Sequence, residues 1–416
     1  IVEAGTGTGK TFAYLTPALL AGGKVIVSTG TKTLQDQLFQ RDLPLLRNAL
    51  TVPVTVALLK GRANYVCHYH LERTLQNGRL SSRQDVGYLR EINRFIKTTA
   101  SGDRAELASV PEQALVWQLV TSTRDNCLGS DCSYYKDCFV MQARRAAQQA
   151  DIVVVNHHLF FADLMLKDTG VAELLPSANT VIFDEAHQLP DIATVFFGQT
   201  LSTSQLFELC RDTVAEGLSN ARDAVDWVKL VAPLERASRD LRLAFGAPTR
   251  MPAAQIEAGG AFWLALDRVA AALADVDAAL QTQAERAETL AQCHRRATEL
   301  QVQLDGWIDA ATLPAAAPAV KLDEASESPF GDDAQMVSWV EVFATTVQLH
   351  RTPLSIAPAF AKQRGGATGR ERAWIFTSAT LSVKGDFTHY AAQMGLDRTK
   401  SLALPSPFDY GSQGLL

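Results

Sequence analysis

The stretch at residues 4–11, Ala-Gly-Thr-Gly-Thr-Gly-Lys-Thr, combines residue types that bind nucleotide phosphates. Glycines let the backbone turn tightly around phosphate oxygens, and the free N–H groups at the start of a following helix face the same oxygens. Lys10 can reach the β- and γ-phosphates, and the Thr11 hydroxyl can bind Mg²⁺. A flexible Gly/Thr turn is the alternative. We predict ATP phosphate binding by Gly5, Thr6, Gly7, Thr8, Gly9, Lys10 and Thr11.

A second polar cluster, Asp184-Glu185-Ala186-His187, directly follows an apolar run. A carboxylate there can bind Mg²⁺ opposite the phosphate loop, and its neighbour can orient and deprotonate the attacking water. We assign Asp184 to the metal, Glu185 to the base, and His187 to coupling with neighbouring motifs. The alternative is an acidic pair at a helix start. Together with Lys10, this cluster predicts hydrolysis of a nucleoside triphosphate.

Four of the six cysteines have the spacing of a metal or cluster site: Cys67 is followed after 59 residues by Cys127, Cys132 and Cys138. Four thiolates suit zinc or an iron–sulfur cluster, and the wide, uneven spacing weakly favours the cluster. The alternative is four ordinary core cysteines. Cys210 and Cys293 stand alone in helical patterns, and we expect them to be packed there.

Basic and aromatic residues alternate around these four cysteines. They are Lys60, Arg62, Tyr65, His68, Tyr69, His70, Arg73, Tyr134, Tyr135, Lys136, Phe139, Arg144 and Arg145. Cations can follow a phosphate backbone while rings stack on bases, which is how single strands are bound. A solvated helical face with ordinary core aromatics is an equal alternative.

The elements that must position these residues are apolar runs typical of strands buried on both faces of a parallel sheet. They lie at residues 24–28, 54–59, 151–155, 180–183 and 373–376. Polar clusters follow four of them, at residues 28–30, 156–158, 184–187 and 377–380. Since ligands bind outside the carboxyl ends of parallel strands, we expect these clusters to line one edge with the phosphate loop. Hydroxyls in the last cluster could link the carboxylate pair to a bound polymer.

Two long insertions interrupt this sheet pattern, at residues 61–150 and 201–349. The second is rich in alanine and helical in pattern, and residues 262–308 are typical of a long helix or helical hairpin. Residues 337–343 and 346–349 are candidate strands that we expect to pair and return to the core.

Composition limits the possible functions. The 416 residues carry a formal net charge of −6, so contact with nucleic acid must come from local basic patches. The sequence has no run of about 18 apolar residues, which excludes a membrane-spanning helix of the usual kind. A chain that opens at Ile1 inside a strand pattern is expected to be an excised or incomplete fragment.

Several motifs together resemble the XPD-like iron–sulfur helicases of superfamily 2, above all the bacterial DinG/YoaA branch. They are residues 3–11, residues 60–67, the later three cysteines, and residues 155–159, 184–187, 377–381 and 404–408. The resemblance covers the whole chain in order. It implies an α/β fold: a RecA-like P-loop NTPase sheet, helicase domain 1, built from residues 1–60, 151–200 and 350–416. It further implies an iron–sulfur cluster domain at 61–150 and a mainly helical Arch domain at 201–349.

The same resemblance implies function. It implies a [4Fe–4S] cluster on Cys67, Cys127, Cys132 and Cys138, Mg-ATP hydrolysis with Mg²⁺ held by Thr11 and Asp184, and 5′-to-3′ unwinding of DNA. The expected partner is single-stranded, forked or tailed duplex DNA in repair or replication, in a cytoplasmic protein without membrane contact. Protein partners stay unknown.

One departure from the family pattern matters. The family needs a second RecA-like domain to complete the ATP site, and a segment before the phosphate loop that helps to read adenine. We therefore expect weak ATPase activity and no processive unwinding from these 416 residues alone. Two alternatives remain: a module that binds single strands or forks with ATP as a switch, and a zinc-containing RNA helicase.

Overall fold

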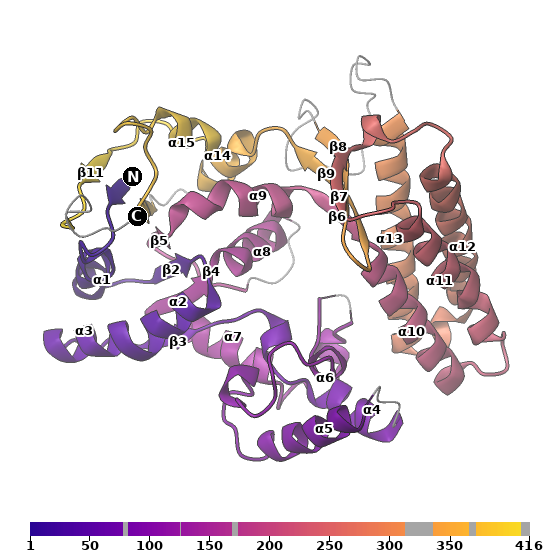
Figure 1. Ribbon diagram of the computed structural model, residues 1–416. Coiled ribbons are helices and arrows are strands. Elements are labelled where there is room, and N and C mark those ends of the chain that lie inside the picture. The colour runs from indigo at the N-terminus through magenta and orange to yellow at the C-terminus, as the bar shows by residue number, and fades with distance from the viewer. Residues whose placement is uncertain (78–81, 125, 169–173, 313–335, 366–371, 409–416) are drawn as a thin grey trace. The chain divides into compact units, whose positions relative to one another are not determined.

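The computed structural model describes residues 1–77, 82–124, 126–168, 174–312, 336–365 and 372–408. The chain divides into two compact units (Figure 1). The first contains Ile1–Phe196 and Ile356–Leu416, and the second contains Phe197–Ser355. Residues 61–150 belong to the first unit, and their assignment to a separate cluster domain stays a prediction.

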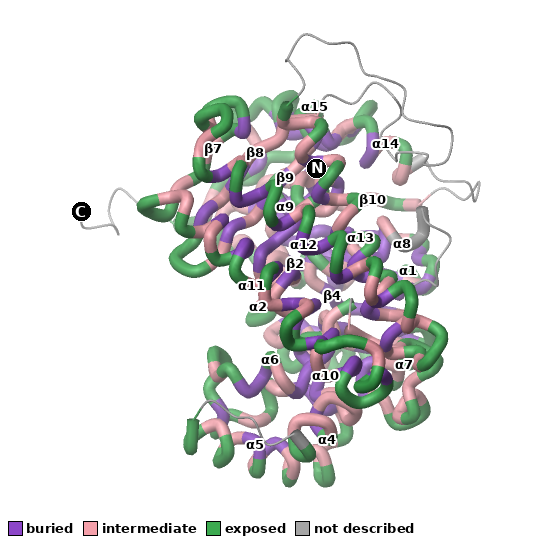
Figure 2. Tube along the Cα trace, turned by 90° about the vertical axis from the view of Figure 1, so that its right-hand side faces the viewer, coloured by how far each residue is buried: buried purple, intermediate pink, exposed green. Residues whose placement is uncertain are grey.

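A seven-stranded parallel sheet organises the first unit, in the order β11-β1-β10-β5-β2-β4-β3. The strands are β1 (Val2–Ala4), β2 (Val25–Thr29), β3 (Val56–Leu58), β4 (Ile152–Asn156), β5 (Thr180–Asp184), β10 (Ala373–Ser378) and β11 (Leu402–Leu404). All five predicted strands are therefore present, and the α/β fold with a RecA-like parallel sheet is confirmed. The strands β2, β4 and β5 are runs of buried residues, mainly Val and Ile with Phe183 in β5, as strands covered on both sides require. Figure 2 shows where buried residues lie along the chain.

Helices connect these strands. They are α1 (Lys10–Ala21), α2 (Lys32–Gln37), α3 (Leu43–Leu50), α8 (His157–Asp168), α9 (Leu189–Phe197), α14 (Ala357–Gly365) and α15 (Thr388–Gln393). On α1, Leu15 and Leu19 are buried against Val25, Val27 and Ile182 of the sheet. The helix begins at Lys10 because Gly9, at φ 78°, takes the left-handed conformation that ends the phosphate loop.

The strand register brings the polar clusters to one edge. Residue Val2 of β1 pairs with Thr377 of β10, and Thr377 pairs with Asp184 of β5. On the other side of β5, Thr29 of β2 pairs with Asn156 of β4. Since every pair is parallel, the carboxyl ends of the strands, and the loops that follow them, lie on the same side of the sheet.

The first insertion packs its own small core beside the sheet. It contains α4 (His68–Asn77), α5 (Arg83–Phe95), α6 (Val116–Val120) and α7 (Phe139–Gln149). Trp117 is buried among Ile92, Val116 and Val120, and its indole N–H donates to the Pro111 carbonyl at 3.0 Å. The insertion therefore has the apolar contacts that a folded element needs.

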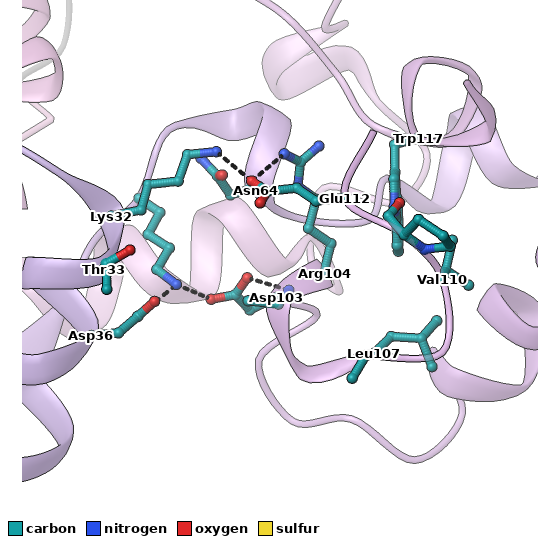
Figure 3. A pocket seen from close by; sticks show the side chains of 14 residues that line it. Lys32, Thr33, Asp36, Asn64, Asp103, Arg104, Leu107, Val110, Glu112 and Trp117 are labelled. Carbon is teal, nitrogen blue, oxygen red and sulfur yellow. Dashed lines mark hydrogen bonds and ion pairs between the residues drawn. The ribbon is translucent and has the colours of Figure 1, made fainter. Parts of the chain in front are cut away.

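A buried lysine joins this insertion to the sheet. The Lys60 side chain is 4 % exposed, and its Nζ lies 2.7 Å from Asp36 on α2 and 2.7 Å from Asp103 in the insertion. Burial alone would lower the pKa of Lys60, but the hydrogen bonds to both carboxylates outweigh it and raise the pKa. The group borders a cavity of about 290 Å³ whose rim carries Lys32, Arg104 and Glu112 (Figure 3).

The second unit combines a helical bundle with a four-stranded antiparallel sheet, in the order β6-β9-β8-β7. Its elements are β6 (Gln199–Ser202), α10 (Thr203–Asn220), α11 (Trp227–Leu243), β7 (Thr249–Pro252), α12 (Ala261–Gln283), α13 (Glu288–Thr312), β8 (Met336–Val342) and β9 (Val347–Pro353). The helical hairpin predicted at residues 262–308 is confirmed as α12 and α13. The prediction that residues 337–343 and 346–349 pair as strands is confirmed, since β8 pairs with β9. The prediction that they return to the core sheet is wrong, because they form a separate sheet with β6 and β7.

Close packing fixes the helices of this unit. Ser202 caps α10 in a capping box with Gln205. A side chain at Gly217 would collide with the Trp227 indole, so glycine allows α10 and α11 to approach closely. Cys210 and Cys293 are buried in this core, as expected. No helix among the described residues is long and apolar enough to cross a membrane.

The Lys60 contacts yield a first prediction. Lys60→Met leaves Asp36 and Asp103 close together with no cation between them, and breaking a buried ion pair in this way costs roughly 3 kcal/mol. We expect the free energy of unfolding of the first unit to fall by about that amount in urea denaturation. The matched control is Lys32→Met, since the exposed Lys32–Glu112 pair at 3.4 Å should contribute less than about 1 kcal/mol. Equal losses from both variants would contradict the structural role of Lys60.

Candidate nucleotide site and thiol cluster

The phosphate loop connects β1 to α1 and has the backbone conformation that its sequence predicts. Gly7 and Gly9 have φ of 82° and 78°, which glycine adopts without strain. The Thr8 hydroxyl donates to the Gly5 carbonyl at 2.8 Å and tightens the turn. Lys10 Nζ donates to the Ala4 carbonyl at 2.8 Å, so the ammonium lies over the loop itself. A nucleotide phosphate would have to draw the ammonium away from this carbonyl.

Asp184 stands at the end of β5, beside this loop. The residue is 6 % exposed, and burial, followed by the charge of Glu185, raises the pKa of its carboxyl to about 6. The Lys10 charge acts in the opposite direction on the same carboxyl, which places Lys10 and Asp184 within electrostatic range. The phosphate loop and the acidic pair therefore meet, although 174 residues separate them. A divalent cation between Thr11 and Asp184 would favour the charged carboxylate.

Glu185 and His187 meet a hydroxyl from the neighbouring strand. His187 Nδ1 lies 2.8 Å from Ser378 Oγ, and the Ser378 hydroxyl donates to Glu185 Oε2 at 3.3 Å. Glu185 has φ 56°, a left-handed conformation that costs a non-glycine residue energy. The strained backbone directs its carboxylate towards Ser378 at the end of β10. The predicted clusters at 184–187 and 377–380 are thus in direct contact.

Within the cluster at 156–158, His157 lies deeper than expected, whereas His158 is exposed. His157 is fully buried, its Nδ1 lies 2.7 Å from Ser28 Oγ, and burial lowers its pKa to about 3. The neutral ring joins the ends of β2 and β4 and lies beside the backbone of Asp184 and Glu185. It supports the edge from within rather than facing a ligand.

Sequence reasoning missed two contributors to this site. The Tyr14 hydroxyl, one helical turn after Thr11, lies beside Asp184 and Thr11 and is buried. Its place on the sheet-facing side of α1 was a signal that could have identified it. Residues 404–408 also cover the phosphate loop: the Leu404 carbonyl accepts the Gly5 N–H at 3.3 Å, and the Phe408 ring lies directly against Gly7.

The four predicted cysteines come from two stretches of the insertion, at Cys67 and at residues 127–138, that lie within electrostatic range of each other. Burial raises the pKa of Cys67 to about 12. A backbone hydrogen bond acts in the opposite direction, and the charges of the other three thiols raise the pKa further. The pKa of Cys132 is also raised, by burial first and then by the charges of Cys127 and Cys138, so these thiols lie within electrostatic range of one another. Arg62 Nη1 lies 2.9 Å from Cys127 Sγ. As placed, no three His, Cys, Asp or Glu side chains in the described parts of the chain are close enough together to hold one metal ion.

These thiols nevertheless fit a thiolate-bound group in their chemistry. Cys67 lies within electrostatic range of the other three thiols, and the Arg62 guanidinium lies beside Cys127. A multi-iron cluster has wider sulfur spacing than a single ion and suits four separated thiolates better. The donor set is thus compatible with the predicted cluster, and the cluster itself remains a proposal.

The basic and aromatic residues around the cysteines divide into two groups. Tyr65 and Phe139 are buried core residues, and Lys60 is the buried partner of two carboxylates. For these three the core interpretation is correct. Lys136 and Arg145 are exposed, and the His68 ring stacks on Phe139 at 4.7 Å and on Tyr134 at 5.6 Å. This second group combines exposed cations with aromatic rings, which is the composition of a surface that binds nucleic acid.

Known proteins share this arrangement of motifs. A family model described as DEAD_2 matches residues 54–206. The ATP-dependent DNA helicase YoaA of Escherichia coli is 43 % identical over 421 residues, covering all of this chain and 62 % of that protein. The protein of the same name from Haemophilus influenzae is 38 % identical over 418 residues, again covering the whole chain. This chain is therefore similar along its whole length to proteins named YoaA, which supports the resemblance to the DinG/YoaA branch.

The chain is also similar to a more distant relative and to a solved structure. The ATP-dependent helicase DinG of Mycobacterium tuberculosis strain H37Rv is 35 % identical over 229 residues, half of this chain. A solved structure called truncated XPD covers 97 % of this chain and 95 % of its own, with a TM-score of 0.44 and 14 % identity. The chain spans 62 % of the length of its two YoaA relatives.

Proposed function

We propose that this chain forms the first motor domain and the inserted domains of an ATP-dependent DNA helicase. One observation carries the proposal: the phosphate loop after β1 and the acidic pair after β5 meet at one sheet edge, with Lys10 in electrostatic range of Asp184. The names of the YoaA relatives, ATP-dependent DNA helicases, support the activity.

The proposed chemistry assigns a task to each group. The N–H groups of residues 5–11 and the Lys10 ammonium bind the triphosphate, and Thr11 and Asp184 would hold Mg²⁺, which withdraws charge from the phosphate oxygens. Glu185 accepts a proton from the attacking water. Ser378 donates to the Glu185 carboxylate at 3.3 Å, and His187, 2.8 Å from Ser378 Oγ, holds that hydroxyl in place. The Tyr14 hydroxyl lies beside the Asp184 carboxylate in the buried part of the site.

We further propose that hydrolysis moves the protein 5′-to-3′ along single-stranded DNA, at forks or tailed duplexes in repair or replication. The exposed cations Lys136 and Arg145 supply local positive charge in a chain whose formal net charge is −6. We assign residues 61–150 to an iron–sulfur domain and 201–349 to an Arch domain. The four cysteines would hold a [4Fe–4S] cluster with a structural task, because hydrolysis needs no electron transfer.

A binding module that uses ATP only as a switch is the second candidate. The contact between the Lys10 ammonium and the Ala4 carbonyl at 2.8 Å favours it in part, since nucleotide must rearrange the loop. The Ser378 contact to Glu185 favours the motor, because a switch has no need of a positioned base. Turnover stimulated by single-stranded DNA in the full-length protein separates the two, and comparison with RNA tests the polymer.

The phosphate loop gives the second prediction. Lys10→Ala removes the cation that neutralises the transferred phosphoryl group, so we expect ATP turnover in the full-length protein to fall by about 100-fold or more. DNA affinity should change by less than about threefold, because the exposed basic residues lie in the insertion. A coupled ATPase assay and fluorescence anisotropy with a labelled single strand measure the two quantities.

The matched control is Lys24→Ala, which removes a lysine of the same unit that donates to backbone carbonyls at 2.5 and 3.1 Å, away from the nucleotide edge. It should leave turnover within about twofold of the parent protein. Full hydrolysis by Lys10→Ala would refute the nucleotide site. Complete loss of DNA binding in that variant would refute the basic surface.

The cysteines give the third prediction. Cys132→Ser removes one of four proposed sulfur ligands, so bound iron and sulfide should be lost from the purified protein, along with visible thiolate–iron absorbance. Unwinding should fall at least about tenfold, while ATP hydrolysis in the absence of DNA persists, because the phosphate loop lies outside the insertion. Cys210→Ser, in the core of the second unit, is the control and should retain all iron. Zinc in place of iron, or full unwinding by Cys132→Ser, would contradict the proposal.

A further inference from the structure

The Glu3 carboxylate makes three contacts with a turn almost four hundred residues away in sequence. Its Oε2 accepts the N–H of Leu381 at 2.5 Å and the N–H of Ser382 at 2.6 Å. Its Oε1 accepts the Ser382 hydroxyl at 2.9 Å. Two successive backbone donors and a hydroxyl therefore converge on one carboxylate. These contacts give a hydrogen-bond acceptor to the N–H groups of Leu381 and Ser382, in the turn that follows β10 at the nucleotide edge.

The charge of Glu3 strengthens these contacts. Burial raises the pKa of Glu3, but the hydrogen bonds from Leu381 and Ser382 outweigh it, and the net pKa lies below its ordinary value. Hydrogen bonds to an ionised acceptor are about twice as strong as neutral ones. The turn is thus held by a group that stays ionised at neutral pH.

The other end of the same turn reaches the hydrolysis site. Ser378 donates to Glu185 and contacts His187, as described above. Glu3 itself immediately precedes Ala4, whose carbonyl accepts Lys10 Nζ. The turn at residues 378–382 is therefore fixed at one end by the proposed base and at the other by the strand that carries the phosphate loop.

These contacts are not needed to build the sheet. The backbone of β1 already pairs with β10 on one side and with β11 on the other. The Glu3 side chain adds nothing to that ladder and binds only the turn. Within the turn, Leu381 is buried and Thr380 is exposed, so the turn presents a hydroxyl at the edge where a bound strand would lie.

We propose that Glu3 is a positioning residue that couples the phosphate loop to the turn at 378–382, and so sets how strongly DNA stimulates ATP hydrolysis. The inference rests on the proposed function. A strand that contacts the turn displaces it, and Glu3 and Ser378 pass that displacement to the phosphate loop and to Glu185 at the same time.

Two substitutions of Glu3 test the coupling in the full-length protein. Glu3→Ala leaves two N–H groups of the turn without an acceptor. Glu3→Gln keeps the geometry, since its oxygen can accept both N–H groups while its amide N–H donates to Ser382 Oγ. We expect Glu3→Ala to reduce the ratio of stimulated to unstimulated kcat by about tenfold, with unstimulated kcat and the KM for ATP within about twofold. Glu3→Gln should retain the ratio within about threefold.

Ser382→Ala, which removes only the hydroxyl contact, is the matched control and should resemble Glu3→Gln. Unchanged stimulation in Glu3→Ala overturns the coupling. Equal loss of unstimulated turnover also overturns it, because Glu3 would then support the phosphate loop alone. Failure of Glu3→Gln to rescue overturns the hydrogen-bond assignment.

Amide hydrogen exchange over residues 378–384 separates this inference from the proposed function. Exchange should accelerate in Glu3→Ala and not in Glu3→Gln, with or without DNA. If exchange responds in this way but DNA does not stimulate the parent protein, the motor proposal fails and the coupling fails with it. If DNA stimulates the parent protein and exchange does not respond, only the Glu3 inference fails.

Discussion

Parallel pairing of β1, β10 and β5 is the constraint on which the site depends. Because the three strands run in one direction, the phosphate loop, Ser378 and Asp184 must emerge on the same side of the sheet. No side-chain contact is needed to bring them there. The side chains then act over short distances: Ser378 reaches Glu185, and Lys10 lies in range of Asp184. Strand order fixes which groups meet, and side chains fix how they are oriented.

The insertion is joined to this edge by charge rather than by apolar contact alone. Lys60 is nearly inaccessible to water and lies at 2.7 Å from a carboxylate of α2 and from one of the insertion. An apolar contact tolerates sliding, whereas an ammonium between two carboxylates has a defined geometry and loses much of its energy when displaced. Since α2 follows β2 at the nucleotide edge, the position of the insertion is tied to the motor sheet. A DNA-binding insertion would need such a link to a hydrolysis site.

Periodicity and motif spacing predicted the parallel strands, the phosphate loop, the acidic pair and the α12–α13 hairpin, because each depends on a pattern that is local in the sequence. These patterns gave wrong predictions where the structure depends on a contact with residues far away in the sequence. The apolar runs at 337–349 indicate strands, but they do not show that these strands pair with β6 and β7 rather than with the core sheet. Lys60, Tyr65 and Phe139 have the composition of a nucleic-acid surface and are buried all the same. Tyr14 and Glu3 carry no motif of their own, and only the folded edge shows what they contact.

Glu185 shows how the edge uses strain. A non-glycine residue at φ 56° keeps that conformation only when its surroundings stabilise it. The hydrogen bond from Ser378, whose hydroxyl also contacts His187, offsets part of this strain. Both depend on the turn after β10, which is anchored by Glu3 on the strand of the phosphate loop. Movement of that turn therefore weakens the contacts that offset the strain and reorients the carboxylate. The proposed hydrolysis site would therefore respond to the turn through Ser378, the last residue of β10, and through Glu185, which directly follows β5.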